Sequence, residues 1–204
     1  MQYKKDEVKR KLIEAGEEEF FAYGFRNSSV RRIVKAAGTT IGNFYNYFSN
    51  KEELFREVVG SELQKFDEFL NGHEEIDDTE FLLNIQDAAS LYKLLKANTS
   101  VFIPVFTKRF YILVACSEGT AFADSKGKVQ EFIKLHFLGH VVDSGTKIGQ
   151  PDETADVLAY EFLEGILYII RKYGSTDKAI TLIQNHMLFF LTGTVGILQS
   201  QGDV

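Results

Sequence analysis

The side chains with the most recognisable chemistry lie between residues 28 and 51, where hydroxyl, amide, guanidinium and ammonium groups recur at helical spacing. The amide of Asn43 can pair with the edge of a base, and Ile41 can contact a thymine methyl group. Hydroxyl and ammonium groups such as those of Tyr45 and Lys51 suit phosphate oxygens. This chemistry is typical of contact with DNA, and the candidate residues are Ser28, Ser29, Arg31, Thr39, Thr40, Ile41, Asn43, Tyr45, Tyr47 and Lys51.

Two short helices joined by a glycine-containing turn would present these side chains. Ser28 or Ser29 is expected to cap a helix that stops at Gly38, and a second helix is expected over residues 41–48. This order lets the first helix brace on the DNA backbone while the second enters the major groove. The apolar side chains that can fill the core between the two helices are Ile33, Ala36, Ala37, Phe44 and Phe48.

Residues 24–54 closely resemble the N-terminal DNA-binding domain of the TetR family of repressors. The motifs that carry the resemblance are Gly24-Phe25, Ser28-Ser29-Val30, Ala36-Ala37-Gly38, Phe44-Tyr45-Asn46-Tyr47-Phe48 and Ser49-Asn50-Lys51-Glu52-Glu53-Leu54. The resemblance implies a homodimer with a helical effector domain, whose last two helices form a four-helix interface with the partner. Ile41 and Asn43 depart from the residues that the family often has beside the glycine, so the operator sequence is not carried over.

Apolar residues recur at steps of three and four along the whole chain, which predicts an all-α fold. We expect a helix-turn-helix, three-helix DNA-binding domain over residues 1–50, a connecting helix over 51–71, and a larger helical effector-binding and dimerisation domain over 72–204. The connecting helix is expected to open with a capping box at Ser49-Asn50-Lys51-Glu52. The other expected helices are 5–23, 80–97, 108–118, 125–147, 151–173 and 177–198.

Charge is divided unevenly along the 204 residues, whose net charge is −6. Residues 1–56 carry a net charge of +3, and residues 57–204 carry −9. A nucleic acid is therefore attracted to the N-terminal segment and repelled by the rest. The acidic run Glu17-Glu18-Glu19 is unusual beside DNA and is expected to form a solvent-facing or dimer-distal patch.

The composition argues against several other classes of protein. The chain has no signal-like start and no apolar run long enough to span a membrane, so a cytoplasmic protein is expected. Cys116 is the single cysteine, cannot form an internal disulfide, and is expected to be a small buried residue. His136 and His140 lie four residues apart, but a third metal ligand is not evident; neither a metal nor a cofactor is expected.

The C-terminal domain is expected to bind a small molecule through some of its aromatic side chains, although most aromatic residues at helical spacing pack a core. Glu164 lies in an otherwise apolar helix, where a carboxylate is costly unless it is paired or hydrated. The candidate effector contacts are Phe102, Phe106, Tyr111, Phe132, His136, Tyr160 and Glu164.

The last helix carries two adjacent apolar stripes. One contains Ile183, Met187 and Phe190, and the other contains Phe189 with the small residue Gly193. Two stripes need two partners, of which one can be the same chain and the other a second subunit. The candidate dimer-interface residues are Ile166, Ile170, Ile183, Met187, Phe190, Gly193, Thr194 and Ile197.

These features predict a homodimeric transcription regulator, a repressor released from a palindromic operator by a small-molecule effector. Two alternatives stay open. The large domain can be a scaffold or protein-docking surface with no small effector. The chain can also be a helical enzyme, but it contains no Ser/His/Asp set, phosphate loop or nucleotide fingerprint. We therefore expect a regulator that is not an enzyme.

Overall fold

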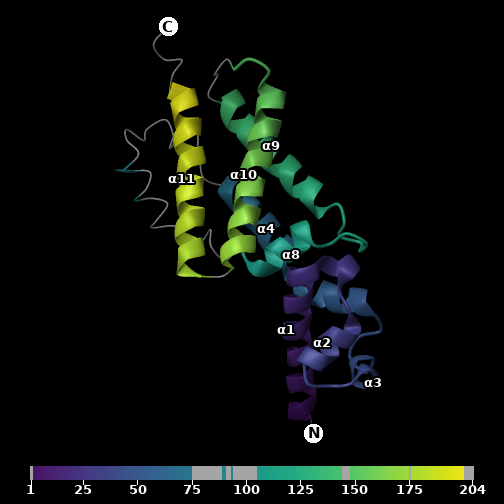
Figure 1. The fold of residues 1–204 in the computed structure, drawn as a ribbon. Helices are drawn as coiled ribbons and strands as arrows, with labels where there is room; N and C mark the ends of the chain where they lie inside the picture. Colours follow the sequence, from purple (N-terminus) through teal and green to yellow (C-terminus); the bar gives the residue numbers. More distant parts are fainter. Residues whose placement is uncertain are drawn as a thin grey trace. The chain divides into compact units, whose positions relative to one another are not determined.

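The structure, a computed structural model, describes residues 2–74, 89, 90, 93, 105–143, 148–174 and 176–199. Within these ranges every regular element is a helix, and the predicted all-α fold is confirmed. The helices are α1 (Gln2–Asn27), α2 (Val30–Ala36), α3 (Ile41–Phe44), α4 (Lys51–Glu74), α8 (Lys108–Ala115), α9 (Ser125–Asp143), α10 (Pro151–Tyr173) and α11 (Asp177–Gln199) (Figure 1).

Contacts between residues divide the chain into two units. Unit 1 comprises Met1–Lys65 and Lys108–Lys126, and unit 2 comprises Phe66–Thr107 and Gly127–Val204. The contacts thus group α8 with the N-terminal helices. The expected domain boundaries at residues 50 and 71 stay a prediction. The break expected at Pro104 and most of the helix expected over 80–97 lie outside the described residues.

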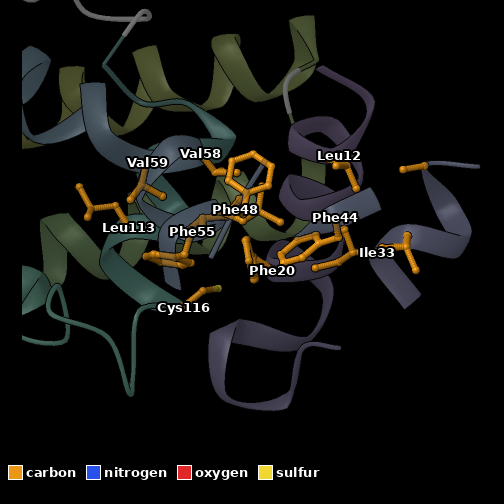
Figure 2. Packing of buried hydrophobic residues seen from close by; sticks show 14 residues of the cluster. Leu12, Phe20, Ile33, Phe44, Phe48, Phe55, Val58, Val59, Leu113 and Cys116 are labelled. Carbon is orange, nitrogen blue, oxygen red and sulfur yellow. The ribbon is translucent and has the colours of Figure 1, made fainter. Parts of the chain in front are cut away.

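A single apolar core holds unit 1 together (Figure 2). The rings of Phe20 and Phe55 are fully buried, with their centroids 5.1 Å apart in an edge-to-face arrangement. Burial of each such ring stabilises the fold by about 1.5–3 kcal/mol relative to its exposure. The core draws on α1, α2, α3, α4 and α8, through Leu12, Phe20, Ile33, Val34, Ala37, Phe44, Phe48, Leu54, Phe55, Val58, Val59, Ile112, Leu113 and Cys116.

The prediction that Ala36 belongs to the core is wrong. Ile33, Ala37 and Phe44 are buried as expected, whereas Ala36 is exposed and Val34 is buried. Successive residues of a helix are about 100° apart around its axis, so positions 33, 34 and 37 share one face and position 36 lies off it.

α1 changes direction at Gly24, whose backbone has φ 70° and ψ 165°. The sequence predicts the helix end at this glycine, but one further turn follows and the element ends at Asn27. Glycine adopts a positive φ without the steric cost that a Cβ brings. The break leaves the amide of Phe25 to donate to the carbonyl of Cys116, at 2.8 Å, instead of to an acceptor within α1.

Charged groups of α1 fasten α8 within unit 1. Glu17 accepts a hydrogen bond from Nε of Arg109 at 2.7 Å, and Glu18 pairs with Lys108. Glu19 is buried. The expectation that the run Glu17-Glu18-Glu19 is solvent-facing is therefore wrong for Glu19, whereas Glu18 is exposed as expected and Glu17 is partly buried. The three carboxylates hold neighbouring elements in place.

In unit 2, α10 and α11 lie side by side (Figure 1). Pro151 begins α10, and Gly174 follows its last residue with φ 64°, both as the sequence predicts. α3 and α8 are shorter than the expected helices 41–48 and 108–118, because turns take over after Phe44 and a bend follows Ala115.

The side chain of His186 on α11 fits against the backbone of α10 at Gly165. Its Nε2 lies 2.9 Å from the carbonyl oxygen of Phe162, so this nitrogen carries the hydrogen that the carbonyl accepts. The imidazole also stacks on the Phe162 ring, with centroids 5.4 Å apart, and meets Phe190 edge-on at 4.9 Å. Burial lowers the pKa of His186, which favours the neutral ring.

This close approach predicts a specific response to Gly165→Ala. A Cβ at position 165 would lie 2.2 Å from Cε1 of His186, so the imidazole must leave its place and lose its hydrogen bond to Phe162. We expect a loss of about 1–3 kcal/mol in the free energy of unfolding, measured by urea denaturation.

Two controls accompany this prediction. Gly139→Ala in α9, where a Cβ would meet no atom within 4 Å, is expected to be neutral or stabilising. In a His186→Ala background the cost of Gly165→Ala should largely disappear. An equal cost in both backgrounds would show that His186 is not the obstacle.

Candidate nucleic-acid interface

Helices α2 and α3 and the turn between them form the helix-turn-helix that the sequence predicts. Gly38, with φ 66°, makes the turn possible, and the amide of Thr39 donates to the carbonyl of Val34 at 2.9 Å. Thr40 caps α3, because its hydroxyl oxygen accepts a hydrogen bond from the amide of Asn43 at 3.1 Å. Local hydrogen bonds therefore fix where α3 begins.

The candidate DNA contacts differ in exposure. Arg31, Thr40, Ile41 and Tyr45 are exposed, and the exposed fractions of Ile41 and Tyr45 reach 41% and 56% although both are large apolar side chains. The remaining candidates are half-buried: Ser28, Ser29, Thr39, Asn43, Tyr47 and Lys51.

Hydrogen bonds hold the amide of Asn43 in place before any DNA arrives. Its Nδ2 donates to the hydroxyl oxygen of Thr39 at 2.8 Å, and its Oδ1 accepts from Nδ2 of Asn46 at 3.3 Å. A pre-oriented amide loses little entropy when it pairs with a base. Tyr47, another candidate DNA contact, is held by apolar packing, since its ring packs against the core of unit 1.

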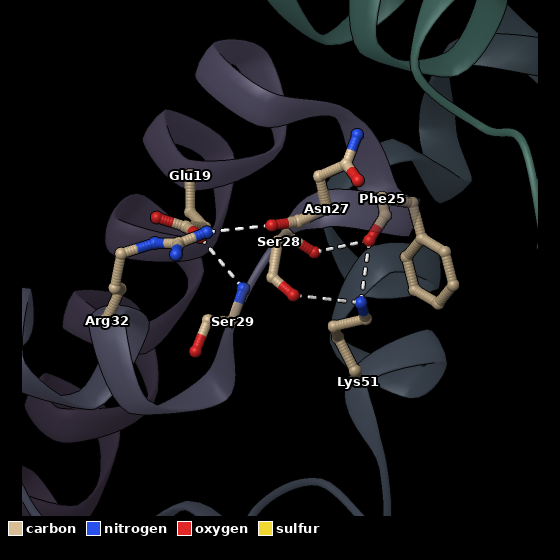
Figure 3. Close-up of polar contacts among 7 residues, drawn as sticks. All are labelled: Glu19, Phe25, Asn27, Ser28, Ser29, Arg32 and Lys51. Atoms are coloured by element: carbon tan, nitrogen blue, oxygen red, sulfur yellow. Dashed lines mark hydrogen bonds and ion pairs between the residues drawn. The ribbon is translucent and has the colours of Figure 1, made fainter.

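Lys51, at the first position of α4, reaches back to the end of α1 (Figure 3). Its ammonium group donates to the carbonyls of Phe25 at 2.6 Å and Ser28 at 3.0 Å, and it lies 4.3 Å from the centre of the Phe25 ring. Burial lowers the pKa of this ammonium group. Two of its three hydrogens are thus engaged within the protein, a role that the sequence pattern does not indicate.

Glu19 of α1 is a buried carboxylate at the start of α2 (Figure 3). Its Oε1 accepts from the backbone amide of Ser29 at 2.8 Å and from Nε of Arg32 at 2.7 Å. Nη2 of Arg32 donates in addition to the carbonyl of Asn27 at 2.8 Å, and the guanidinium lies 4.5 Å from the centre of the Tyr23 ring. The hydrogen bond that Arg32 donates to Glu19 raises the pKa of Arg32.

Two predicted helix caps are wrong. Neither Ser28 nor Ser29 caps α2 through its hydroxyl: that of Ser28 donates to the carbonyl of Phe25, and Ser29 makes no side-chain cap. The cap of α4 lies one residue later than expected. Oδ1 of Asn50 accepts from the amide of Glu53 at 2.8 Å, and the Glu53 carboxylate accepts from the amide of Ser49 at 2.6 Å. The hydroxyl of Ser49 also donates to the Glu53 carboxylate, and the hydrogen bonds from this hydroxyl and from the Ser49 amide lower the pKa of Glu53.

The candidate effector contacts are distributed over both units. Tyr111 belongs to unit 1, where its ring lies 5.2 Å from that of Phe21. In unit 2, Phe106 is buried, Phe132 lies 6.0 Å from Phe66, and His136 lies 6.4 Å from Phe137. Tyr160 is exposed, Glu164 is partly buried, and Phe102 lies outside the described residues.

Four of the eight candidate dimer contacts are buried within the chain. Ile166, Ile170, Ile183 and Met187 are buried, so their side chains pack against their own subunit. Phe190 and Thr194 are half-buried and Gly193 is exposed, while the side chain of Ile197 lies outside the described residues. The exposed aromatic residues on α10 and α11 are Tyr160, Tyr168 and Phe189.

Within the described ranges, no three His, Cys, Asp or Glu side chains come together as metal ligands would. The side chain of His140, the expected neighbour of His136, lies outside those ranges. None of the helices that the structure describes is long and apolar enough to cross a membrane.

The family model described as bacterial regulatory proteins, tetR family, matches residues 12–58. The fatty acid metabolism regulator protein of Bacillus subtilis is 36% identical over 179 residues, which are 83% of this chain and 80% of that protein. The uncharacterized HTH-type transcriptional regulator YhgD of the same organism is 34% identical over 179 residues, covering 83% of this chain and 88% of the relative.

The chain belongs to the TetR family. The crystal structure of a TetR family transcriptional regulator from Chloroflexus aurantiacus has the same fold, with a TM-score of 0.53 and 18% identity over 96% of this chain and 89% of that one. As a TetR-family protein, the chain is a DNA-binding transcription regulator, and the family consists of regulatory proteins rather than enzymes.

Proposed function

We propose that this TetR-family regulator is a homodimeric repressor that binds a palindromic operator and is released from it by a small molecule. The observation that carries the proposal is the surface of α3, where Ile41 is exposed beside the pre-oriented amide of Asn43. Apolar and amide groups on a short helix behind a tight turn suit direct contact with bases in the major groove.

Within this proposal the candidate DNA contacts have different tasks. Asn43 and Ile41 read bases, and Arg31, Thr40 and Tyr45 contact phosphates, because their exposed guanidinium and hydroxyl groups can donate hydrogen bonds. Ser28, Ser29, Thr39, Tyr47 and Lys51 lie behind them, half-buried. The expected division into residues 1–50, 51–71 and 72–204 is kept as a functional division, with α8 bound to the DNA-binding part.

We further propose that α10 and α11 form the dimer interface. Tyr168 and Phe189 are 59% and 74% exposed in the single chain, and Gly193 on α11 is exposed and small enough for a neighbouring helix to approach closely. Large aromatic side chains are common anchors of interfaces. The buried candidates, such as Ile166 and Ile183, would support this surface from within.

An effector can release the dimer from the operator only if it binds two arrangements of the dimer with different affinities. Two recognition helices about 34–36 Å apart fit successive major grooves, and an effector that binds better to another spacing shifts the dimer away from the operator. The proposed contacts in unit 2 are Phe106, Phe132, His136, Tyr160 and Glu164, with Phe102 and Tyr111 as further candidates.

Substitutions of Asn43 and Arg31 separate base reading from phosphate contact. On a duplex enriched from a random pool, Asn43→Ala should lower affinity for the selected sequence while leaving affinity for unrelated DNA unchanged. The loss should be about 1–3 kcal/mol. Arg31→Gln should weaken binding to the selected sequence and to unrelated DNA alike, and it should reduce the slope of log K against log salt by about 0.9. Equal losses of specificity in both variants would contradict this assignment.

The proposed dimer interface is tested by Phe189→Glu, because a carboxylate buried against a partner without a counter-charge is costly. We expect the dimer dissociation constant to rise about 100-fold or more in sedimentation equilibrium. Leu135→Glu is the matched control, since Leu135 is a 56% exposed apolar residue on α9, outside the proposed interface. A Phe189→Glu protein as dimeric as the parent would place the interface elsewhere.

Compounds of fatty acid metabolism are the first effectors to test, because a relative 36% identical over 80% of its length is named a fatty acid metabolism regulator. Fatty acids of different chain length should raise the melting temperature of the protein and lower its operator affinity over the same concentration range. If neither these nor other small metabolites change operator affinity, the large domain is a dimerisation or docking scaffold without an effector.

A further inference from the structure

Residues 25–29, which comprise the last turn of α1 and the two residues before α2, are held by charged side chains from three helices. The carbonyls of Phe25 and Ser28 accept from Lys51 of α4, and the carbonyl of Asn27 accepts from Arg32 of α2 (Figure 3). The amide of Ser29 donates to Glu19 of α1. The backbone that leads into α2 is therefore fixed by bonds to charged groups, which are stronger than those between neutral partners.

We propose that Glu19 and Lys51 are positioning residues for operator binding, which set the direction of α2 and α3 without touching DNA. The inference rests on the operator binding proposed above and deepens it. It assigns to Lys51 a role different from the phosphate contact that its sequence motif indicates.

Both hydrogen-bond partners of Glu19 described here lie at the start of α2. A single oxygen, Oε1, joins the amide of Ser29 at 2.8 Å and Nε of Arg32 at 2.7 Å, and the side chain is only 8% exposed. A buried carboxylate is costly unless such partners stay in place. Any rotation of α2 away from α1 would lengthen both bonds, so the charge of Glu19 keeps α2 in one orientation.

Lys51 acts on the other side of the same segment. Its ammonium lies between the carbonyls of Phe25 and Ser28 and over the Phe25 ring, so it neutralises the negative end of the last turn of α1. A phosphate would have to compete with these partners or use the one remaining hydrogen. Because Lys51 is also the first residue of α4, it ties α4, α1 and the start of α2 together.

Glu19 offers a test in which two explanations predict opposite signs. Removal of a negative charge from unit 1, and release of Arg32 from its partner, both make the protein more attractive to phosphates. Electrostatics alone therefore predicts that Glu19→Gln binds the operator more tightly. If Glu19 positions α2, the same substitution weakens binding, because Gln keeps the shape of the side chain but loses the charged bonds.

The experiment compares full-length Glu19→Gln with Glu14→Gln, which removes the same charge from an exposed position on α1. Operator affinity is measured on the selected duplex, at a temperature where circular dichroism shows each protein to be folded. We expect Glu19→Gln to bind about tenfold more weakly, the equivalent of one lost charged hydrogen bond, and Glu14→Gln to bind as well as the parent or better. Unchanged or tighter binding by folded Glu19→Gln overturns the proposal, even if its melting temperature is lower.

Lys51→Met provides a second, independent test, in which operator affinity is measured over a series of salt concentrations. A positioning residue lowers operator affinity without changing the slope of log K against log salt, whereas loss of a phosphate contact lowers the slope by about 0.9, the change expected for Arg31→Gln. A slope reduced as in Arg31→Gln overturns the assignment of Lys51. Failure of the unsubstituted protein to bind any duplex would instead refute the proposed function itself.

Discussion

The DNA-reading part of this protein depends on how the backbone of residues 25–29 is held. Gly24 turns the chain with a positive φ, and from there Phe25 donates its amide to Cys116 and accepts from Lys51 through its carbonyl. The segment after α8, the first turn of α4 and the end of α1 thus meet at one residue. α2 starts only a few residues later, so its orientation follows from these bonds.

The apolar pattern was sufficient to predict most of the helices that the structure describes. Spacings of three and four, Gly38, Gly174 and Pro151 locate most helix ends, because capping and proline geometry are local properties of the backbone. The exposure of Thr40 and Ile41 was also predictable, since both residues follow directly from the turn. These residues depend on their immediate neighbours in sequence.

The charged groups were harder to predict, because their partners lie far away in the chain. Glu19 is seven residues after Leu12, a spacing that places both on one face of α1, so its burial could have been inferred from the pattern. Its partner Arg32 lies on another helix, and nothing local indicates the pairing. The same holds for Lys51, which sits in a motif that favours a phosphate contact but donates to carbonyls 23 and 26 residues earlier.

In unit 2, too, the sequence pattern predicts the helices but not the contacts between them. The stripe of α11 that contains Ile183 and Met187 was expected at the dimer interface, yet it packs inside the subunit, while Phe189 on the neighbouring stripe is exposed. Periodicity identifies two apolar faces but not which of them meets α10. Which face does so depends on contacts between the two helices, such as that of His186 with the backbone of α10 at Gly165, and these do not appear in the spacing.

Selection of bound sequences from a random duplex pool by the purified full-length protein tests directly whether α3 reads an operator. If it does, the enriched sequence is palindromic, its half-sites are about one helical turn apart or a multiple of that distance, and one dimer binds it with strong salt dependence. Enrichment of no sequence, with weak binding even at low salt, would contradict the assignment of α3 as a helix that reads an operator.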